Sequence, residues 1–150
     1  YVFEDGSLRG FKAQISLFSK LMIPFENAVD IGCGEGGDLS LMLASRCKNV
    51  TSLDYDPKVI SGLTKILKQK GIKNITPKVA DMTKTGLPDD YADLVLMSQV
   101  LHHATDPRLA LKEAVRILFN FDPVIWGLSM FGKFERLREH RAANRRASHS

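Results

Sequence analysis

The chain has 150 residues, 44% of them hydrophobic and 25% charged, which is typical of one ordinary globular domain with a buried core. Its formal net charge of +4 comes from residues 133–150, where six Lys and Arg face two Asp and Glu, so the remainder gives no electrostatic reason to expect nucleic acid. No apolar run reaches the roughly 18 to 20 residues that span a bilayer, and the first residues lack a signal-peptide layout, which predicts a cytoplasmic protein without a membrane span.

Helical and strand patterns alternate along the first half of the chain. Apolar residues at helical spacing predict a leading helix over residues 7–22, and the apolar run "NAVDI" predicts a buried strand before a glycine turn. "DLSLMLASRC" predicts the next helix and "NVTSLD" the second strand. Asp56 and Pro57 are a typical capped helix start, and Gly71 is a typical helix end. The apolar stripe of that helix comprises Val59, Ile60, Leu63, Ile66 and Leu67.

The alternation continues in the second half. "NITPKVA" predicts a third strand, and its Pro77 places that strand at the edge of the sheet because proline cannot donate to a ladder. "DLVLMS" predicts a fourth, buried strand, and Asp106 with Pro107 begins another capped helix. The expected buried face of this helix comprises Leu111, Ala114, Val115 and Leu118. "PVIWGL" is a candidate fifth strand, and residues 131–146 are a candidate helix.

Strands that alternate with helices predict an α/β, doubly wound and mostly parallel sheet with right-handed crossovers. Ligands bind to such sheets beyond the carboxyl ends of the strands. The chemically unusual segments follow the expected strands in this way: the glycine turn, "LDYD", "ADM" and "SQVLHH". The sequence therefore predicts one binding site, built from four loops at a single edge of the sheet.

The glycine turn in "VDIGCGEGGDLS" can be interpreted in two ways. Gly32, Gly34 and Gly37 form the G-x-G-x-x-G of dinucleotide-binding proteins, whereas Gly32, Gly34 and Gly36 form a tighter G-x-G-x-G. Either pattern lets the backbone approach a ligand closely. The glycines alone leave both ligands open.

The charges around the turn favour a cationic ligand. Asp30, Glu35 and Asp38 lie in the turn with no basic residue between them, and three carboxylates would repel a pyrophosphate. The same acids suit a ligand with an ammonium and a sulfonium, namely S-adenosylmethionine, although acids in a first turn also stabilise any helix. Asp54, with Tyr55 beside it, can accept hydrogen bonds from ribose hydroxyls in either cofactor. Gly37 then becomes a position where helices pack.

Taken in order, "VDIGCGEGG", "LDYD", "VADM", "LPDDYADLVLMSQVLHH" and "DPRLALKEAVRIL" resemble the class I S-adenosylmethionine-dependent methyltransferases. The likeness is greatest to the type 11, quinone-biosynthesis-like branch that acts on small molecules, and it covers about residues 27–118. It implies a Rossmann-like methyltransferase fold with strand order 3-2-1-4-5, and methyl transfer to a small-molecule acceptor. It does not name the acceptor or the acceptor atom.

The resemblance also implies roles for individual residues. The methionine part of the donor is expected at Asp30 and the turn, the ribose at Asp54, and the adenine at Asp81 and Met82, where a carboxylate can accept from the amino group and a thioether can pack on the ring. The expected cofactor-binding residues are Asp30, Gly32, Cys33, Gly34, Gly36, Asp54, Tyr55, Asp81, Met82 and Ser98. Core filling is an equal alternative for Met82.

Candidate catalytic residues follow the fourth strand. His102 and His103 lie where the family places the methyl acceptor, and either can orient or deprotonate it, although one of two adjacent histidines often has a structural role. Cys33 and Cys47 match no zinc pattern, so both are expected to be reduced thiols, and no metal site is expected. The loop lacks the proline-rich "NPPY"-like motif of enzymes that methylate DNA bases, so nucleic acid is an unlikely partner.

The pattern of the family ends after "EAVRIL". The expected glycine turn is missing, and few residues remain, so the sheet is expected to lack its last two strands. We expect a methyltransferase domain over residues 1–128 and a basic, partly helical or disordered tail over 129–150. The apolar "PVIWGLSMF" and an exposed edge favour a homo-oligomer. Two alternatives follow: a cofactor-binding fragment that is inactive or needs a partner, and an NAD-dependent oxidoreductase.

Overall fold

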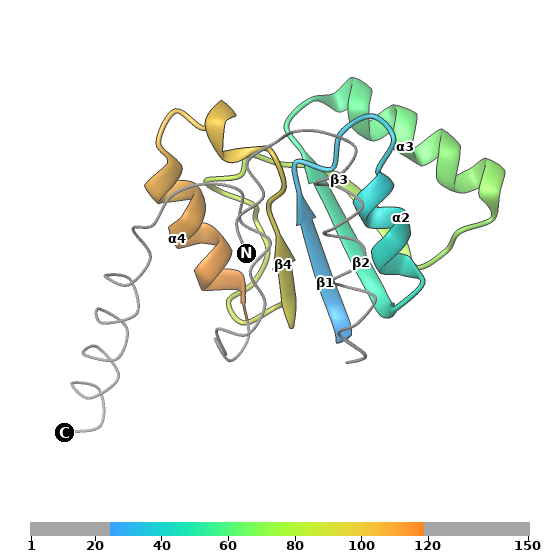
Figure 1. Ribbon diagram of the computed structural model, residues 1–150, viewed down its shortest axis with the longest axis horizontal. Helices are drawn as coiled ribbons and strands as arrows, with labels where there is room; N and C mark the ends of the chain where they lie inside the picture. The colour runs from blue at the N-terminus through green and yellow to red at the C-terminus, as the bar shows by residue number, and fades with distance from the viewer. Residues whose placement is uncertain (1–24, 119–150) are drawn as a thin grey trace.

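The computed structural model describes residues 25–118, which form a layered α/β unit (Figure 1). Its elements in chain order are β1 (Phe25–Ile31), α2 (Asp38–Ala44), β2 (Cys47–Asp54), α3 (Pro57–Lys70), β3 (Ile75–Val79), β4 (Leu94–Leu96), a 3₁₀ turn η1 (Leu101–His103) and α4 (Pro107–Ile117). The expected leading helix over 7–22, the fifth strand and the basic tail lie outside the described residues.

The four strands form one parallel sheet in the order β3-β2-β1-β4, which confirms the expected fold class and the described part of its strand order. β1 lies between β2 and β4, and Asp30 near its carboxyl end is opposite Ser52 of β2 and Leu96 of β4. The order in which strands are added to the sheet reverses at β1: β2 and β3 lie on one side of it, and β4 lies on the other. In an open parallel sheet this is the position where a ligand site is expected.

Two apolar clusters cover the two faces of the sheet. Leu43 of α2 and Leu63 and Leu67 of α3 pack with one set of strand residues. Ala110 and Ile117 of α4 pack with Val29 and the other strand residues of the second cluster. Helices therefore cover both faces, as parallel strands require. None of the helices within residues 25–118 is long and apolar enough to cross a membrane.

The capped helix starts are confirmed. The Asp56 carboxylate accepts from the backbone N–H of Lys58 at 2.8 Å, and the Asp106 carboxylate accepts from that of Arg108 at 2.9 Å, each beside a proline at the first helical position. Gly71 ends α3 in the left-handed conformation, with φ of 66°. Residues close to the two ends of α3 therefore determine where this helix begins and ends.

β3 lies at the edge of the described sheet, as its proline predicted. Pro77 is opposite Ser52 of β2, and it has no N–H to offer a further strand. Two predicted boundaries were wrong: the helix before β2 ends at Ala44, and Cys47 already belongs to β2. Cys47 pairs with Phe25, so the ladder of β1 begins earlier than its apolar run indicated.

The predicted buried face of α4 was wrong. The buried residues are Ala110, Glu113 and Ile117, whereas Leu111, Ala114, Val115 and Leu118 are only partly buried. A glutamate occupies the centre of this face, and its carboxylate accepts hydrogen bonds there from Thr85, before β4, and from Arg116 on α4 itself. The spacing of apolar residues along a helix does not reveal that a charged residue is buried between them.

Candidate functional site

The segments that follow β1 and β3 are both hydrogen-bonded to the end of β2 at the carboxyl edge of the sheet. The backbone N–H groups of Gly32 and Cys33 donate to the Leu53 carbonyl of β2 at 2.7 and 3.0 Å. The N–H of Ala80, after β3, donates to the Asp54 carbonyl at 2.9 Å. These bonds bring the glycine turn and the segment after β3 to the end of β2, and Val100 of the loop after β4 lies against Gly32 of the glycine turn.

The glycine turn is made of left-handed residues. Gly32 has φ of 78° and Gly34 has φ of 67°, conformations that L-residues rarely adopt. A Cβ on Gly32 would lie 2.3 Å from Cγ2 of Val100, in the loop after β4, so this glycine is needed for packing as well. A Cβ on Gly34 would meet nothing within 4 Å. Gly34 thus leaves open space along the backbone of the turn.

Gly37 is a packing position, which confirms the interpretation of the overlapping glycine pattern. It is buried before α2 with φ of 57°, and a Cβ there would lie 2.5 Å from Cδ1 of Leu63 on α3. The third glycine of G-x-G-x-x-G is therefore explained by the contact between two helices. It no longer favours a pyrophosphate.

Asp30 is a buried carboxylate at the end of β1, 1% exposed. Its Oδ2 accepts from the Ser40 hydroxyl at 2.6 Å, and the Ser52 hydroxyl donates to Ser40 at 2.6 Å. Its Oδ1 is buried without a hydrogen-bond partner among the described residues. Burial raises the pKa of Asp30 to about 6, against the lowering effect of the Ser40 hydrogen bonds, and Asp54 raises it further. A cation beside Oδ1 would offset this cost.

Two serines that were not predicted as site residues form a hydrogen-bonded chain to Asp30. Ser40 lies in the first turn of α2 and Ser52 within β2, and both are fully buried. The available signal in the sequence was a polar residue, Ser52, inside a predicted strand. In the sheet Ser52 lies opposite Asp30. Pairing it with Asp30 required the strand register, which only the fold supplies.

Asp54 connects the glycine turn to the end of β2. Its Oδ2 accepts from the Gly34 N–H at 3.2 Å and its Oδ1 from the Asp56 N–H at 3.0 Å. These bonds fix the carboxylate beside the open side of Gly34, where the sequence placed the ribose. Tyr55 is 74% exposed, so its ring is available at the surface next to Asp54 and contributes nothing to the core.

Asp81 and Met82 differ in their surroundings. Asp81 is exposed, and its Oδ1 accepts from the N–H and the hydroxyl of Thr83, both at 2.7 Å. These two bonds lower the pKa of Asp81, so it is an ionised acceptor at neutral pH. Met82 is partly buried against the apolar cluster under α4. Core filling, the alternative role for Met82, therefore explains part of its position.

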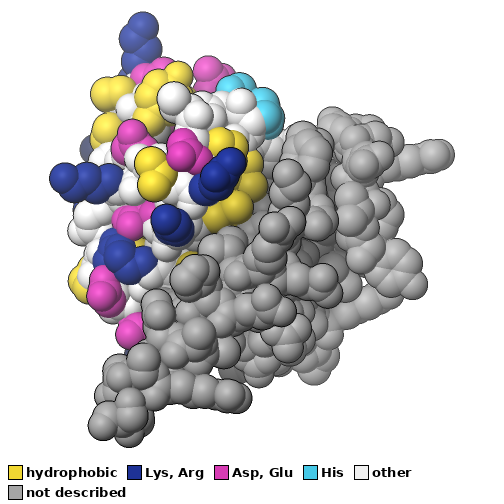
Figure 2. Space-filling view, turned by 90° about the vertical axis from the view of Figure 1, so that its left-hand side faces the viewer, with side chains coloured by type: hydrophobic (Ala, Val, Ile, Leu, Met, Phe, Trp, Pro, Cys, Tyr) yellow, Lys and Arg dark blue, Asp and Glu magenta, His cyan; other side chains and the backbone are white. Residues whose placement is uncertain are grey.

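The loop after β4 places Ser98, Gln99 and the histidines at the same edge. Gln99 has φ of 53°, an uncommon conformation for a residue with a side chain, and Val100 behind it is buried against Gly32. His102 and His103 are exposed in η1, with ring centroids 3.9 Å apart. Histidine side chains reach the surface at one end of the face in Figure 2, where charges of both signs are interspersed.

The cysteines are free thiols in the structure. Cys33 lies in the glycine turn, half-buried, and desolvation with the nearby charges of Asp30 and Asp54 raises its pKa to about 12. It is therefore a neutral thiol at physiological pH and a poor nucleophile. Within residues 25–118, no three His, Cys, Asp or Glu side chains are grouped so that they could hold a metal ion.

A parallel sheet of this order, with a glycine turn after its first strand and acids after the next two, defines the class of Rossmann-like methyltransferase folds. The family described as "Methyltransferase domain" matches residues 29–120. The chain belongs to this family, whose class I members use S-adenosylmethionine as the methyl donor.

Individual relatives agree with this assignment. An uncharacterized methyltransferase of Bacillus subtilis, YcgJ, is 24% identical over 90 residues, which are 60% of this chain and 35% of YcgJ. Its crystal structure superposes with a TM-score of 0.67 at 22% identity, over 72% of this chain and 47% of that one. Norajmaline N-methyltransferase of Rauvolfia serpentina is 27% identical over 104 residues, 67% of this chain and 35% of its own length. The chain thus spans about a third of these curated relatives.

Proposed function

We propose that this protein binds S-adenosylmethionine at the glycine turn and transfers its methyl group to a small-molecule acceptor. The observation that carries the proposal is the unpartnered, buried Oδ1 of Asp30 at the end of β1. A buried carboxylate is costly without a cation, and the donor offers an ammonium group. The norajmaline methyltransferase, named for a small-molecule acceptor, supports the acceptor class.

The other residues of the edge fit the parts of the donor. In this proposal Gly32, Cys33, Gly34 and Gly36 border the methionine part with their backbone. Asp54 accepts from the ribose hydroxyls beside the open side of Gly34, and Tyr55 flanks the nucleoside. Asp81 accepts from the adenine amino group, Met82 packs against the ring, and Ser98 lies beside the reacting end.

Methyl transfer needs positioning and exclusion of water more than it needs bond chemistry from the protein. When bound, the donor supplies a methyl group on a sulfonium, and in-line attack forms the acceptor–carbon bond as the sulfur–carbon bond breaks. A base is needed where the acceptor must lose a proton. His102 or His103 performs this step in the proposal, since both are exposed beside Val100, which packs on the glycine turn.

Replacing His102 and His103 separately by Ala is expected to separate their roles. The variant that lacks the base should lose about a hundredfold or more in kcat and keep its affinity for the donor, because the base acts after binding. Turnover with labelled donor over a panel of small acceptors measures the first quantity, and calorimetry the second. Each histidine is the matched control for the other, and unchanged turnover in both variants would refute the assignment.

The alternatives are separated by calorimetric titration of the full chain. We expect binding of S-adenosylmethionine and S-adenosylhomocysteine and none of NADH, because the acids around the turn repel a pyrophosphate. Binding of NADH without binding of the methyl donor would contradict the proposal and support an oxidoreductase. Donor binding without transfer to any acceptor would instead support an inactive or partner-dependent fragment.

A further inference from the structure

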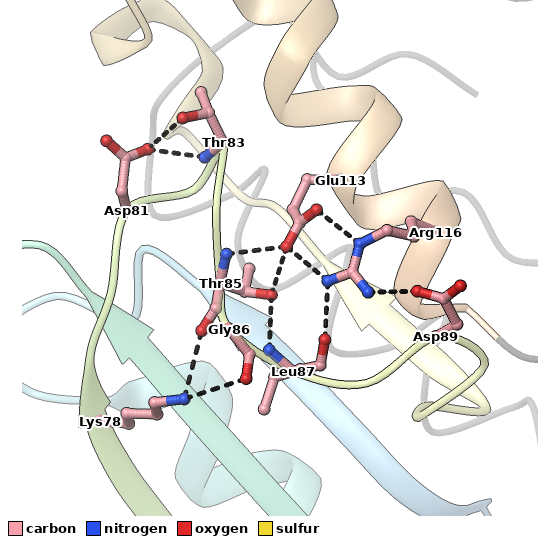
Figure 3. A network of polar contacts seen from close by, with 9 residues as sticks. All are labelled: Lys78, Asp81, Thr83, Thr85, Gly86, Leu87, Asp89, Glu113 and Arg116. Carbon is pink, nitrogen blue, oxygen red and sulfur yellow. Dashed lines mark hydrogen bonds and ion pairs between the residues drawn. The ribbon is translucent and has the colours of Figure 1, made fainter.

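The segment between β3 and β4 begins with a short turn that carries Asp81 and Met82. The turn is closed by the Lys84 N–H, which donates to the Asp81 carbonyl at 3.0 Å. On its incoming side, the Ala80 N–H is tied to Asp54 of β2. Thr83 occupies one oxygen of Asp81, and the second oxygen points away from Thr83 (Figure 3). Among residues 25–118 this second oxygen has no hydrogen-bond partner, so the turn presents it as an available acceptor.

On its outgoing side, the turn is fastened to α4 by a buried pair. Thr85 is 1% exposed and Glu113 is 8% exposed. Both the N–H and the hydroxyl of Thr85 donate to Oε1 of Glu113, at 2.8 and 2.6 Å (Figure 3). Hydrogen bonds to a charged acceptor are about twice as strong as neutral ones. Thr85 directly follows Lys84, so this pair holds the end of the turn.

Arg116 keeps Glu113 ionised and aimed at Thr85. Its Nε donates to Oε2 of Glu113 and its Nη2 to Oε1, both at 2.8 Å. These bonds, with those from Thr85, lower the pKa of Glu113 to about 2. Arg116 also donates to the Leu87 carbonyl at 2.7 Å and pairs with Asp89. The buried carboxylate is therefore fully compensated.

We infer that Thr85 and Glu113 are positioning residues that hold the Asp81–Lys84 turn for recognition of the adenine base. The inference rests on the proposed function, because it assumes that the free oxygen of Asp81 meets the amino group of the donor. A carboxylate can accept from the amino group of adenine and repels the carbonyl oxygen that hypoxanthine carries in its place. Base preference therefore reports the position of Asp81 more directly than affinity does.

The test compares two ligands, S-adenosylhomocysteine and S-inosylhomocysteine, by calorimetry on the full chain. We expect the unaltered protein to prefer the adenine ligand by at least about tenfold, since one charge-assisted bond is replaced by repulsion. Thr85→Val keeps the side-chain shape and removes both bonds of the hydroxyl, the one to Glu113 and the one from the Leu87 N–H, and it should reduce the preference to about twofold. Thr85→Ser restores the hydroxyl and should restore the preference, although it loses a buried methyl group.

Asp89→Asn is the control, because it removes the negative charge of an exposed partner of Arg116 and leaves the turn untouched. It should keep the full preference. The inference is overturned if folded Thr85→Val keeps the preference, or if all three variants lose it alike. Should Thr85→Val fail to fold, Glu113→Gln is measured with the same two ligands and the same criterion. Equal binding of both ligands by the unaltered protein also overturns the inference while leaving the cofactor site intact, whereas binding of neither overturns the proposed function itself.

Discussion

Asp30→Asn is expected to weaken binding of S-adenosylmethionine about a hundredfold, since removing one partner of a buried charge pair costs 2 kcal/mol or more. Asn fills the same volume as Asp and can still accept from Ser40, so the fold should persist. The change removes the negative charge beside the proposed ammonium of the donor. Calorimetry of the variant and the unaltered protein measures the difference, and equal affinities would contradict the central assignment.

The pH dependence of binding provides a second readout for the same residue. The pKa of Asp30 is about 6 in the folded protein without ligand. Below this pH a proton neutralises the carboxylate that the ammonium needs, so affinity should fall about tenfold per pH unit. The Asn variant has no carboxylate to protonate, so its affinity for the donor should stay constant between about pH 5 and 7.

The stability of the unliganded protein should show the opposite trend. The pKa of Asp30 is raised on folding from the ordinary aspartate value of 3.8 to about 6, so the folded state holds the proton more tightly than the unfolded state. The contribution of Asp30 to the free energy of unfolding is then greatest at low pH and declines by about 3 kcal/mol as the pH rises from 3.8 to 6. Asp30→Asn should remove this component, which denaturant unfolding at several pH values measures.

Gly32→Ala is expected to destabilise the fold by about 3 kcal/mol or more, because it combines two penalties. The new Cβ would lie 2.3 Å from Cγ2 of Val100, and the residue would have to keep φ of 78°. Relief of the clash requires the loop after β4 to move, so methyl transfer should decline as well. Chemical denaturation followed by circular dichroism measures the change in the free energy of unfolding.

Gly34→Ala is the matched control for Gly32→Ala. It has a similar φ of 67° but nothing within 4 Å of the added carbon, so it should cost only about 1 kcal/mol in stability. Val100→Ala in the background of Gly32→Ala should recover only the part of the steric cost that comes from the valine methyl groups, because Cβ of residue 100 would still lie 2.8 Å from the added carbon. Equal costs at the two glycines would show that the contact with Val100 carries no energy.

The sequence by itself determined the order of the elements, the caps of α3 and α4, and the edge position of β3. Each of these depends on residues close together in the chain: Asp56 with Pro57, Asp106 with Pro107, Gly71 and Pro77. The loops that form the site were also predicted, because parallel strands must end at one edge. These interactions are local, so the conformational preferences of a few neighbouring residues are enough to predict them.

The tertiary structure decided which side chains support the site. The packing of α2 brings the Ser40 hydroxyl to Asp30, Ser52 of β2 donates to Ser40, and Thr85 reaches Glu113 across 28 residues. The buried face of α4 was predicted wrongly for a related reason, since the carboxylate of the buried Glu113 is satisfied by Thr85, 28 residues away, as well as by Arg116 on its own helix. Whether a polar residue can be buried depends on partners far along the chain, and only the folded arrangement brings those partners together.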